Sequence, residues 1–513
     1  MPALFLKEKY CIILIFVILY KDVSVCTRMC MICREDHLEA YRMEDKNLEE
    51  RLDKVLWAVD RKSDKEKKAA AQAAERAQAV EKTEPAVKPA RHKQDVPKAP
   101  TPKDPEDEIS DEQPDAPKKK KRKKRYIVLA VIAVFFVSAY LTFVYSDIPF
   151  IKYWRTIYIE TAMSTNSHQW LATWFIPKSV IDEVMAEKEA AFAAQRGLES
   201  RWDDGAASGS AATPVPTPTP VVVDPRDEFF EKYWELDSKS FRKYLDKKSI
   251  DTKQELDNLK IDNLDGSLNI KTKKKDKVLV CDIKNSLIIV GVEGSSYVGK
   301  LAIVKDPSLV CVGKASHLPS RGDIIDEFGE NYNAVLAINA SGFVDKGGHG
   351  SGGAIRGSLV IDGVDYSQPE GGDFKFFGMR KKNNRFYIES PWNVNVKKYR
   401  WGVQFFPALV VDGKCVVAGT YGLGIQPRTT VGQAKDGSFL MLIVDGRQIG
   451  YSLGCTMEEC ANQLIKYKVY QAANLDGGSS SIMWYNGRQI TKSSSPSGIG
   501  RYLPDALYVK KVR

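Results

Sequence analysis

An uninterrupted apolar stretch, residues 126–145, places the strongest constraint on how this chain can fold. Its 20 residues read YIVLAVIAVFFVSAYLTFVY and include no charged side chain. A helix of this length can cross the hydrocarbon core of a bilayer. Eight consecutive basic residues, 118–125, precede it, and basic flanks stay on the cytoplasmic side of a membrane. The sequence therefore predicts a single-pass cell-membrane protein with a cytoplasmic N-terminus and an extracytoplasmic region after residue 145.

The same basic run explains most of the positive charge of the chain. The 513 residues carry a net charge of +10, of which the run supplies eight units. Because this charge is concentrated beside the apolar stretch, it indicates membrane topology and not a nucleic-acid-binding surface. We therefore expect the membrane to be a partner through residues 126–145, and we expect no nucleic acid.

Two regions precede the apolar stretch. Residues 1–42 contain a short apolar core and are interpreted as an N-terminal extension, whose translation stays open because Met43 offers another start. Residues 43–125 are interpreted as a cytoplasmic charged helix followed by a disordered, basic segment. Leucine and valine recur with coiled-coil spacing within 43–85. This spacing predicts a solvated helix with weak self-association.

Three regions separate the apolar stretch from the last half of the chain. Residues 146–200 form a juxtamembrane segment rich in tryptophan and tyrosine, which favours a membrane surface or a partner protein. Residues 201–225 are a linker rich in Pro, Ser and Thr, which we expect to hold the following residues away from the bilayer. Residues 226–269 have the composition of a helical arm that docks on the domain or on a partner.

The remaining residues, 270–513, have the pattern of a strand-rich, mixed α+β domain. Short β-branched runs begin near residue 277, and later Asp-Gly and Asn-Gly pairs lie between apolar segments, as hairpin turns do. One helix is expected to begin at Thr456, because Thr456 and Glu459 have the spacing of a capping box. Five of the nine cysteines follow the apolar stretch, and this odd number does not indicate a disulfide framework.

The stretch 474–481, with the sequence NLDGGSSS, is the best candidate for a reaction centre. It lies between two apolar runs, 469–473 and 482–485, that are expected to be buried strands. A mere connecting turn would need only about two to four residues and no such density of hydrogen-bond donors. The stretch contributes one carboxylate, two glycines and three hydroxyls at a single point of the chain.

Other polar segments also follow or interrupt apolar runs, so they could meet this stretch in one cleft. Simple structural readings stay open for them, since Asp445-Gly446 could be a hairpin turn and Arg428 a surface charge. The glycine-rich run could be a mobile loop or a backbone cradle for a ligand. These segments are 339–343 (NASGF), 347–357 (GGHGSGGAIRG), 427–430 (PRTT) and 444–447 (VDGR).

Taken in this order, the motifs at 339–343, 427–429, 444–447 and 474–478 resemble the phosphodiester glycosidase family over about residues 295–510. That family includes the lysosomal-pathway uncovering enzyme and bacterial proteins of exopolysaccharide biosynthesis. The juxtamembrane stretch 161–173 is also similar to membrane-anchored bacterial members. The chain departs from the family pattern at Ser479, where a third glycine is usual, and at 340–342, where the usual motif is Asn-Gly-Gly-Phe-Phe. A side chain at position 479 could narrow the pocket or alter the choice of substrate.

The resemblance implies hydrolysis of a sugar-1-phosphodiester. The leaving phosphate is a stable anion, so the site needs a cationic or N–H-rich cradle and a carboxylate more than a strong general acid. Which aspartate acts as the base stays open. The resemblance implies catalytic roles for Asp476, Asp445 and Asn339, and substrate binding by Arg428, Thr429, Asn474, Gly477, Gly478, Ser479 and Ser480.

No motif specifies a cofactor or a metal ligand, although these carboxylates could hold a divalent cation. The expected partner is a glycan or glycosyl-phosphate substrate. The predicted function is that of a bacterial, membrane-anchored extracytoplasmic hydrolase of glycosyl phosphodiester bonds in cell-wall or exopolysaccharide glycans at the cell surface. Two alternatives remain: a non-catalytic glycan-binding or assembly protein in exopolysaccharide biosynthesis, and a glycan-phosphate transferase.

Overall fold

The structure, a computed structural model, describes residues 119–165, 167–202 and 224–512. The predictions for the N-terminal extension, for the self-associating helix at 43–85 and for most of the linker at 201–225 lie outside these residues.

The apolar stretch forms the second part of a long helix, α4 (Lys119–Tyr145). Within the described residues, Tyr126–Tyr145 is the one helical segment long and apolar enough to cross a membrane. Only 6% of its most apolar window is buried against the rest of the molecule. The helix predicted from the sequence is therefore present with its apolar side chains exposed, and its insertion into a membrane remains a prediction.

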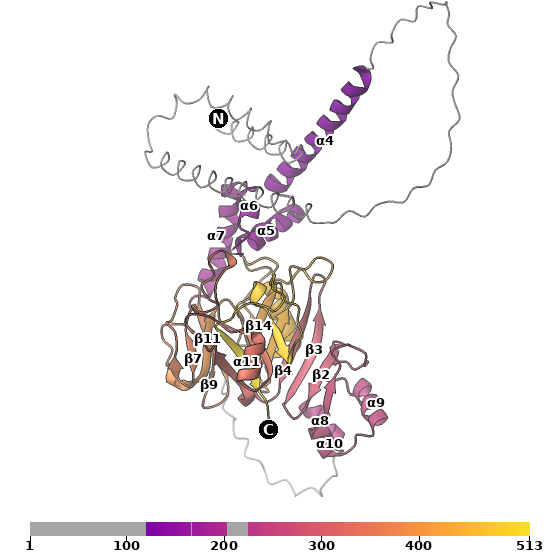
Figure 1. The fold of residues 1–513 in the computed structure, drawn as a ribbon, viewed down its shortest axis with the longest axis vertical. Coiled ribbons are helices and arrows are strands. Elements are labelled where there is room, and N and C mark those ends of the chain that lie inside the picture. Colours follow the sequence, from indigo (N-terminus) through magenta and orange to yellow (C-terminus); the bar gives the residue numbers. More distant parts are fainter. Residues whose placement is uncertain (1–118, 166, 203–223, 513) are drawn as a thin grey trace, which may run out of the picture. The chain divides into compact units, whose positions relative to one another are not determined.

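Three helices follow α4 directly: α5 (Pro149–Met163), α6 (Trp170–Thr173) and α7 (Lys178–Gln195). Arg155 of α5 is buried and caps the end of α4, because its Nη1 donates hydrogen bonds to the carbonyl oxygens of Val144 (2.8 Å) and Ser146 (3.0 Å). The Tyr140 hydroxyl of α4 donates to the carbonyl oxygen of Phe175 (2.7 Å). These bonds tie the end of α4 to α5 and to the segment between α6 and α7. Figure 1 shows α5 and α6 beside the end of α4.

The juxtamembrane helices pack directly on the strand-rich region. Gln195 of α7 exchanges two hydrogen bonds of 3.1 Å with the backbone of Ala408. Thr161 of α5 accepts a hydrogen bond from the Ile425 amide, and this close approach requires glycine at 424, since a Cβ there would lie 2.3 Å from Thr161 Oγ1. Polar side chains of α5 and α7 thus pair with the domain directly, through contacts outside the linker at 201–225. The expectation that this linker holds the following residues away from the bilayer stays a prediction.

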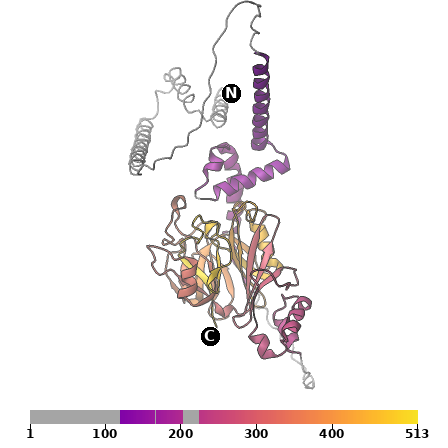
Figure 2. The same ribbon diagram turned by 45° about the vertical axis from the view of Figure 1, so that its right-hand side comes forward.

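The predicted arm forms three short helices: α8 (Pro225–Lys232), α9 (Ser238–Lys248) and α10 (Lys253–Asp257). Asp237 and Thr252 cap α9 and α10 by accepting hydrogen bonds from backbone amides. Phe229, Phe241 and Leu245 are buried in the same apolar cluster as strands β2 (Lys277–Asp282) and β3 (Leu287–Glu293), so the arm covers one end of the sheet that contains these strands (Figure 2).

Three antiparallel sheets form the domain within the described residues. The order of the large sheet is β1 (Lys260–Asp262), β2 (Lys277–Asp282), β3 (Leu287–Glu293), β4 (Val298–Val304), β15 (Phe439–Val444), β14 (Arg428–Ala434), β16 (Val469–Asn474), β12 (Ala408–Val411) and β13 (Lys414–Cys415). The second is β10 (Phe386–Glu389), β9 (Lys375–Arg380), β11 (Tyr399–Phe405), β7 (Leu359–Ile361) and β8 (Val364–Asp365). The third is β18 (Arg488–Gln489), β17 (Met483–Tyr485), β6 (Ala334–Asn339), β19 (Asp505–Lys510) and β5 (Val310–Lys314).

The large sheet is the middle layer, which explains the uninterrupted apolar run at 439–444. In β15, Leu440, Leu442 and Val444 face a core that includes α12 (Met457–Lys466) and the arm. The alternate residues Phe439, Met441 and Ile443 face the core shared with the two smaller sheets. Helix α11 (Ile325–Asn331) packs on the third sheet. The strand-rich α+β character predicted from the sequence is therefore confirmed, as is the capping box of Thr456 and Glu459 at the start of α12.

Candidate active site

The predicted motifs meet where four strands begin or end. Strand β14 begins at Arg428 and runs antiparallel to β15 and β16, so its start lies beside their ends, with Arg428 opposite Val444. Strand β6 ends at Asn339, and the Asp476 amide donates a hydrogen bond of 3.0 Å to the carbonyl oxygen of Ala340. Segments far apart in the sequence are thus joined at one edge of the fold.

A cleft of about 530 Å³ opens at this edge. Its lining combines the 474–480 loop with the start of β14, with the glycine-rich loop after β6 and with the segment between α5 and α6. Seven of the predicted site residues line it: Arg428, Asn474, Asp476, Gly477, Gly478, Ser479 and Ser480.

Asp476 is a carboxylate of this cleft whose pKa suits proton transfer at neutral pH. Burial raises the pKa of Asp476 to about 7, and the negative charge of Asp345 adds to the rise. A hydrogen bond with Ser480, the positive charge of Arg501 and the Gly477 amide oppose it. A group with this pKa is poised to exchange a proton during a reaction at neutral pH.

Arg428 is buried and held by the backbone around it. Its Nη2 donates to the carbonyl oxygens of Leu423 (2.9 Å) and Gly424 (2.8 Å), and its Nε donates to that of Cys455 (3.3 Å). Among the described residues no hydrogen bond engages its Nη1. Burial lowers the pKa of Arg428 from the usual 12.5, but a guanidinium stays charged at neutral pH. A fixed cation with an unused donor suits recognition of a phosphate.

Three further arginines line the cleft that were not predicted as site residues: Arg447, Arg501 and Arg356, the last of which pairs with Glu370. Arg447 Nε and Nη2 donate to Gln426 Oε1 (2.9 and 2.6 Å). Arg447 Nη2 lies close to the main chain of Gly478: a Cβ built on Gly478 would lie 3.1 Å from this nitrogen. Gly478 also has a φ of 63°, which favours glycine. Arg501 pairs with Asp345 (2.8 Å) and donates to Ser479 Oγ (3.4 Å). Arg447 belongs to the 444–447 motif, whereas no sequence signal distinguished Arg501 or Asp345.

Asn339 and Thr429 lie beneath the cleft and do not line it. Asn339 Nδ2 donates to the carbonyl oxygen of Asp476 (2.6 Å), and its Oδ1 accepts from the Ile482 amide (3.2 Å) and from Thr429 Oγ1 (2.8 Å). Both side chains are completely buried. Their contacts hold the two ends of the 476–482 loop, so this geometry supports positioning and not the direct substrate contacts that the sequence suggested.

Asp445 also lies outside the cleft lining. Its Oδ2 accepts a hydrogen bond from the Tyr451 hydroxyl (2.8 Å), and its Oδ1 accepts from the Lys492 amide (3.0 Å). Burial raises the pKa of Asp445, while Tyr451 and Lys300 oppose the rise. Because both oxygens serve neighbouring loops, the structure gives no support to a catalytic role for Asp445.

Asn474 lines the cleft and differs from Asn339 in having a side-chain atom without a partner. Its Nδ2 donates to the carbonyl oxygen of Phe406 (2.8 Å). Its Oδ1 is buried and has no hydrogen-bond partner among the described residues. A buried acceptor without a partner carries a free-energy cost that a new hydrogen-bond donor would relieve.

The departures from the family pattern fall in different surroundings. Ser341 donates two hydrogen bonds to Asp505, from its amide (2.7 Å) and from its hydroxyl (2.6 Å), and does not line the cleft. Ser479 does line it, and its hydroxyl accepts from Arg501. The departure that lies in the cleft is therefore the one at 479.

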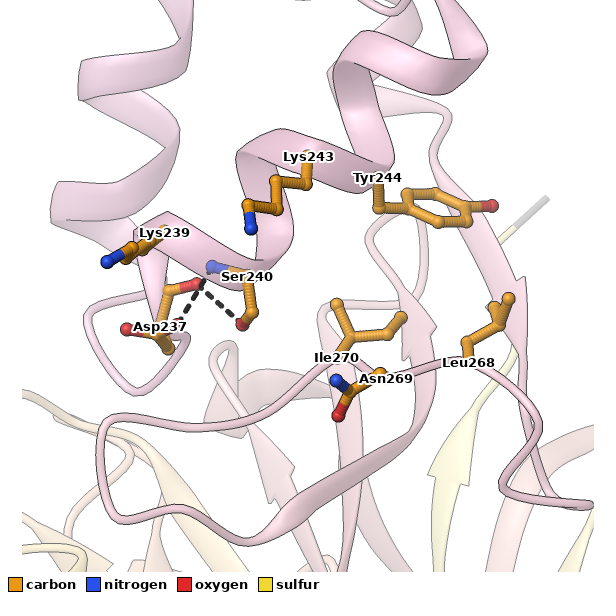
Figure 3. A pocket seen from close by; sticks show the side chains of 8 residues that line it. All are labelled: Asp237, Lys239, Ser240, Lys243, Tyr244, Leu268, Asn269 and Ile270. Carbon is orange, nitrogen blue, oxygen red and sulfur yellow. Dashed lines mark hydrogen bonds between the residues drawn. The ribbon is translucent and has the colours of Figure 1, made fainter.

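A second cavity of about 380 Å³ lies between α9 and the residues before β2 (Figure 3). Lys239 and Lys243 line it, but Asp237 is occupied in capping α9 through the Ser240 amide (2.8 Å). None of the predicted site residues lies there. In the part of the chain that the structure describes, no group of three or more Cys, His, Asp or Glu side chains could hold a metal ion.

Comparison with known proteins agrees with the motifs. The family model described as phosphodiester glycosidase matches residues 332–510. The SPbeta prophage-derived uncharacterized protein YomE of Bacillus subtilis (strain 168) is 29% identical over 194 residues, which are 34% of this chain and 28% of that protein. The chain thus spans less than a third of the length of that relative.

Solved structures with a similar arrangement were also found. The catalytic domain of zebrafish N-acetylglucosamine-1-phosphodiester alpha-N-acetylglucosaminidase, auto-inhibited by its pro-peptide, is 20% identical with a TM-score of 0.37, over 44% of this chain and 82% of that one. A putative exported protein of Burkholderia pseudomallei K96243 is 15% identical with a TM-score of 0.33, over 44% and 76%. Residues 332–510 of this chain, which hold all four motifs, thus match the phosphodiester glycosidase family model.

Proposed function

We propose that this protein is a membrane-anchored hydrolase that cleaves sugar-1-phosphodiester bonds in cell-wall or exopolysaccharide glycans outside the cytoplasm. The observation that carries the proposal is the presence in one cleft of Asp476, whose pKa is about 7, and of Arg428, whose Nη1 is unused. The first can accept a proton and the second can bind a phosphate.

The proposed reaction breaks the bond between the anomeric carbon and the phosphate oxygen. Water attacks the anomeric carbon, its proton passes to the Asp476 carboxylate, and the bonding electrons leave with the phosphate oxygen. The products are the free sugar and a phosphate monoester. Arg428, Arg447 and Arg501 surround the cleft, and their charge stabilises the additional negative charge on the departing phosphate.

Asn474 and Ser479 complete the proposed site. The unpartnered Oδ1 of Asn474 can accept a hydrogen bond from a sugar hydroxyl. Ser479 places a hydroxyl beside Arg501, where it can contact the phosphate. Asn339 and Thr429 act below them by holding the loop that carries Asp476.

The decisive experiment measures release of sugar from an N-acetylglucosamine-1-phosphodiester by the full chain in detergent micelles. Asp476→Asn should lower kcat/KM by about 10²–10⁴-fold, the usual contribution of a general acid or base, while the protein stays folded. Asp265→Asn, at an exposed position outside the cleft, is the matched control.

Full activity of the Asp476 variant would refute the assignment of this residue. Binding of the phosphodiester without release of sugar by the unaltered chain would refute the hydrolase and favour a glycan-binding protein. A product that forms only when an acceptor alcohol is added would instead indicate a transferase.

A further inference from the structure

One wall of the cleft comes from the segment that joins α5 to α6. Ser164, Thr165, Ser167 and His168 all line the cleft together with Asp476 and Arg428. Ser167 Cβ lies 3.5 Å from where a Cβ on Gly348 would be, so this segment closes against the glycine-rich loop. The strand-rich domain alone therefore does not enclose the site.

Helix α5, which leads into this segment, is connected to Arg447 of the cleft through the side chain of Gln426. Gln426 Nε2 donates to the carbonyl oxygen of Thr161 in α5 (2.9 Å), and Gln426 Oε1 accepts both hydrogen bonds from Arg447. Because one amide group holds both partners, the position of α5 is coupled to that of the Arg447 guanidinium.

The other side of this connection leads to the apolar helix. Val144 of α4 is completely buried among Ile159 of α5, Ala172 of α6 and Ile181 of α7. Arg155 and Tyr140 add the hydrogen bonds described above. An unbroken series of packed contacts thus runs from the end of α4 to the cleft wall.

Aromatic side chains are exposed along α5 and α6, immediately after the apolar helix. Phe150 and Trp174 are 72% and 70% exposed, and Trp170 lies against Trp174 with ring centroids 5.3 Å apart. Tyr153 and Trp154 are also largely exposed. Tryptophan and tyrosine favour the interface between lipid headgroups and water, where their rings are half buried. The continuity of this aromatic surface with α4 indicates that the surface of the same bilayer covers it.

The aromatic surface and the cleft wall are very close along the chain. His168 lines the cleft, and Trp170 lies two residues later, a separation of at most about 7 Å between Cα atoms. A cleft wall held so near the headgroup level can reach phosphates attached to lipids, whereas a site at the end of a long spacer would reach distant polymer.

We infer that the substrate is tethered in the same membrane as the enzyme: a sugar joined through its 1-phosphate to a long-chain lipid alcohol. This inference rests on the proposed hydrolysis of a sugar-1-phosphodiester and replaces the glycan polymer named there by a lipid-linked substrate. The α5–α6 surface lies in the interface and presents the cleft to the headgroup. Water attacks the anomeric carbon, the carbon–oxygen bond to the phosphate breaks, and the products are the free sugar and the lipid phosphate monoester.

The test compares two substrates with the full chain reconstituted in phosphatidylcholine–phosphatidylglycerol vesicles. One is N-acetylglucosamine-1-phosphate esterified to a polyprenol in the same vesicles, and the other is its methyl ester in solution. The double variant Trp170→Ser, Trp174→Ser should lose about tenfold or more in rate on the lipid ester, from the loss of two interfacial anchors, and retain its rate on the methyl ester. The matched control is Trp392→Ser, because Trp392 is 65% exposed on the domain and lies outside the cleft lining.

A second readout is independent of turnover. Quenching of tryptophan fluorescence by brominated lipids should fall in the double variant and stay unchanged in the Trp392 variant. Hydrolysis of the methyl ester but not of the lipid ester by the unaltered chain would overturn this inference alone. Equal loss on both substrates, or no loss on either, would also overturn it. Failure of the unaltered chain to cleave either ester would refute the proposed function itself.

Discussion

Replacing Asn339 by alanine tests whether this residue positions the site or contacts the substrate directly. The side chain is completely buried and makes hydrogen bonds to the Asp476 carbonyl, the Ile482 amide and the Thr429 hydroxyl. Thr429 Oγ1 keeps another contact, with Ser481 Oγ (3.3 Å), so two backbone groups lose their partners. At about 1–3 kcal/mol for each buried group left unpaired, Asn339→Ala should lower the free energy of unfolding by about 2–6 kcal/mol.

The assay is thermal unfolding of the full chain beside kinetics on the soluble phosphodiester. For a folded part of this size the stability loss corresponds to a fall in Tm of roughly 3–8 °C, with a lower kcat because the 476–482 loop is no longer held. Asn474→Ala is the matched comparison: it removes one hydrogen bond, to Phe406, and should cost about 1 kcal/mol while raising KM through loss of the free Oδ1. An Asn339 variant that unfolds within about 2 °C of the unaltered protein, yet has lost turnover, would show direct action on the substrate and refute this reasoning.

Three other predictions concern Asp476 and its neighbour Ser479. The base must be ionised and its pKa is about 7, so kcat/KM should fall about tenfold per pH unit below about pH 6; a rate independent of pH from 5 to 8 would contradict this. The raised pKa means that the folded state binds the proton more tightly than the unfolded chain, so the contribution of Asp476 to stability is lost as pH rises towards 7; Asp476→Asn should therefore raise Tm more at pH 8 than at pH 5. Ser479→Gly removes the acceptor of the Arg501 hydrogen bond and widens the cleft, so KM should change more than Tm. If the variant and the unaltered protein have the same KM for a methyl phosphodiester and the same KM for a bulky one, position 479 does not select the substrate.

Local patterns in the sequence determined a large part of the structure. The uncharged stretch at 126–145 is helical, and the capping box at Thr456 begins α12, because helix formation and capping depend on residues within one or two turns. The turn-rich, β-branched pattern after residue 277 indicated a strand-rich domain. The polar motifs were recognisable because each lies next to an apolar run, where a strand begins or ends and side chains from different strands can converge.

Tertiary structure alone decided how these parts combine. Thr161 and Gln426 are 265 residues apart in the chain, and no periodic pattern reports such a pairing. Asn339 and Asp445 belong to the same set of four motifs as Arg428 and Asp476, but burial and hydrogen-bond partners place the first two beneath the cleft or outside it. The pKa of Asp476 likewise arises from burial and from Asp345, which belongs to another loop. Periodicity and turn chemistry act over a few residues, whereas burial and electrostatic environment depend on atoms that only folding brings together.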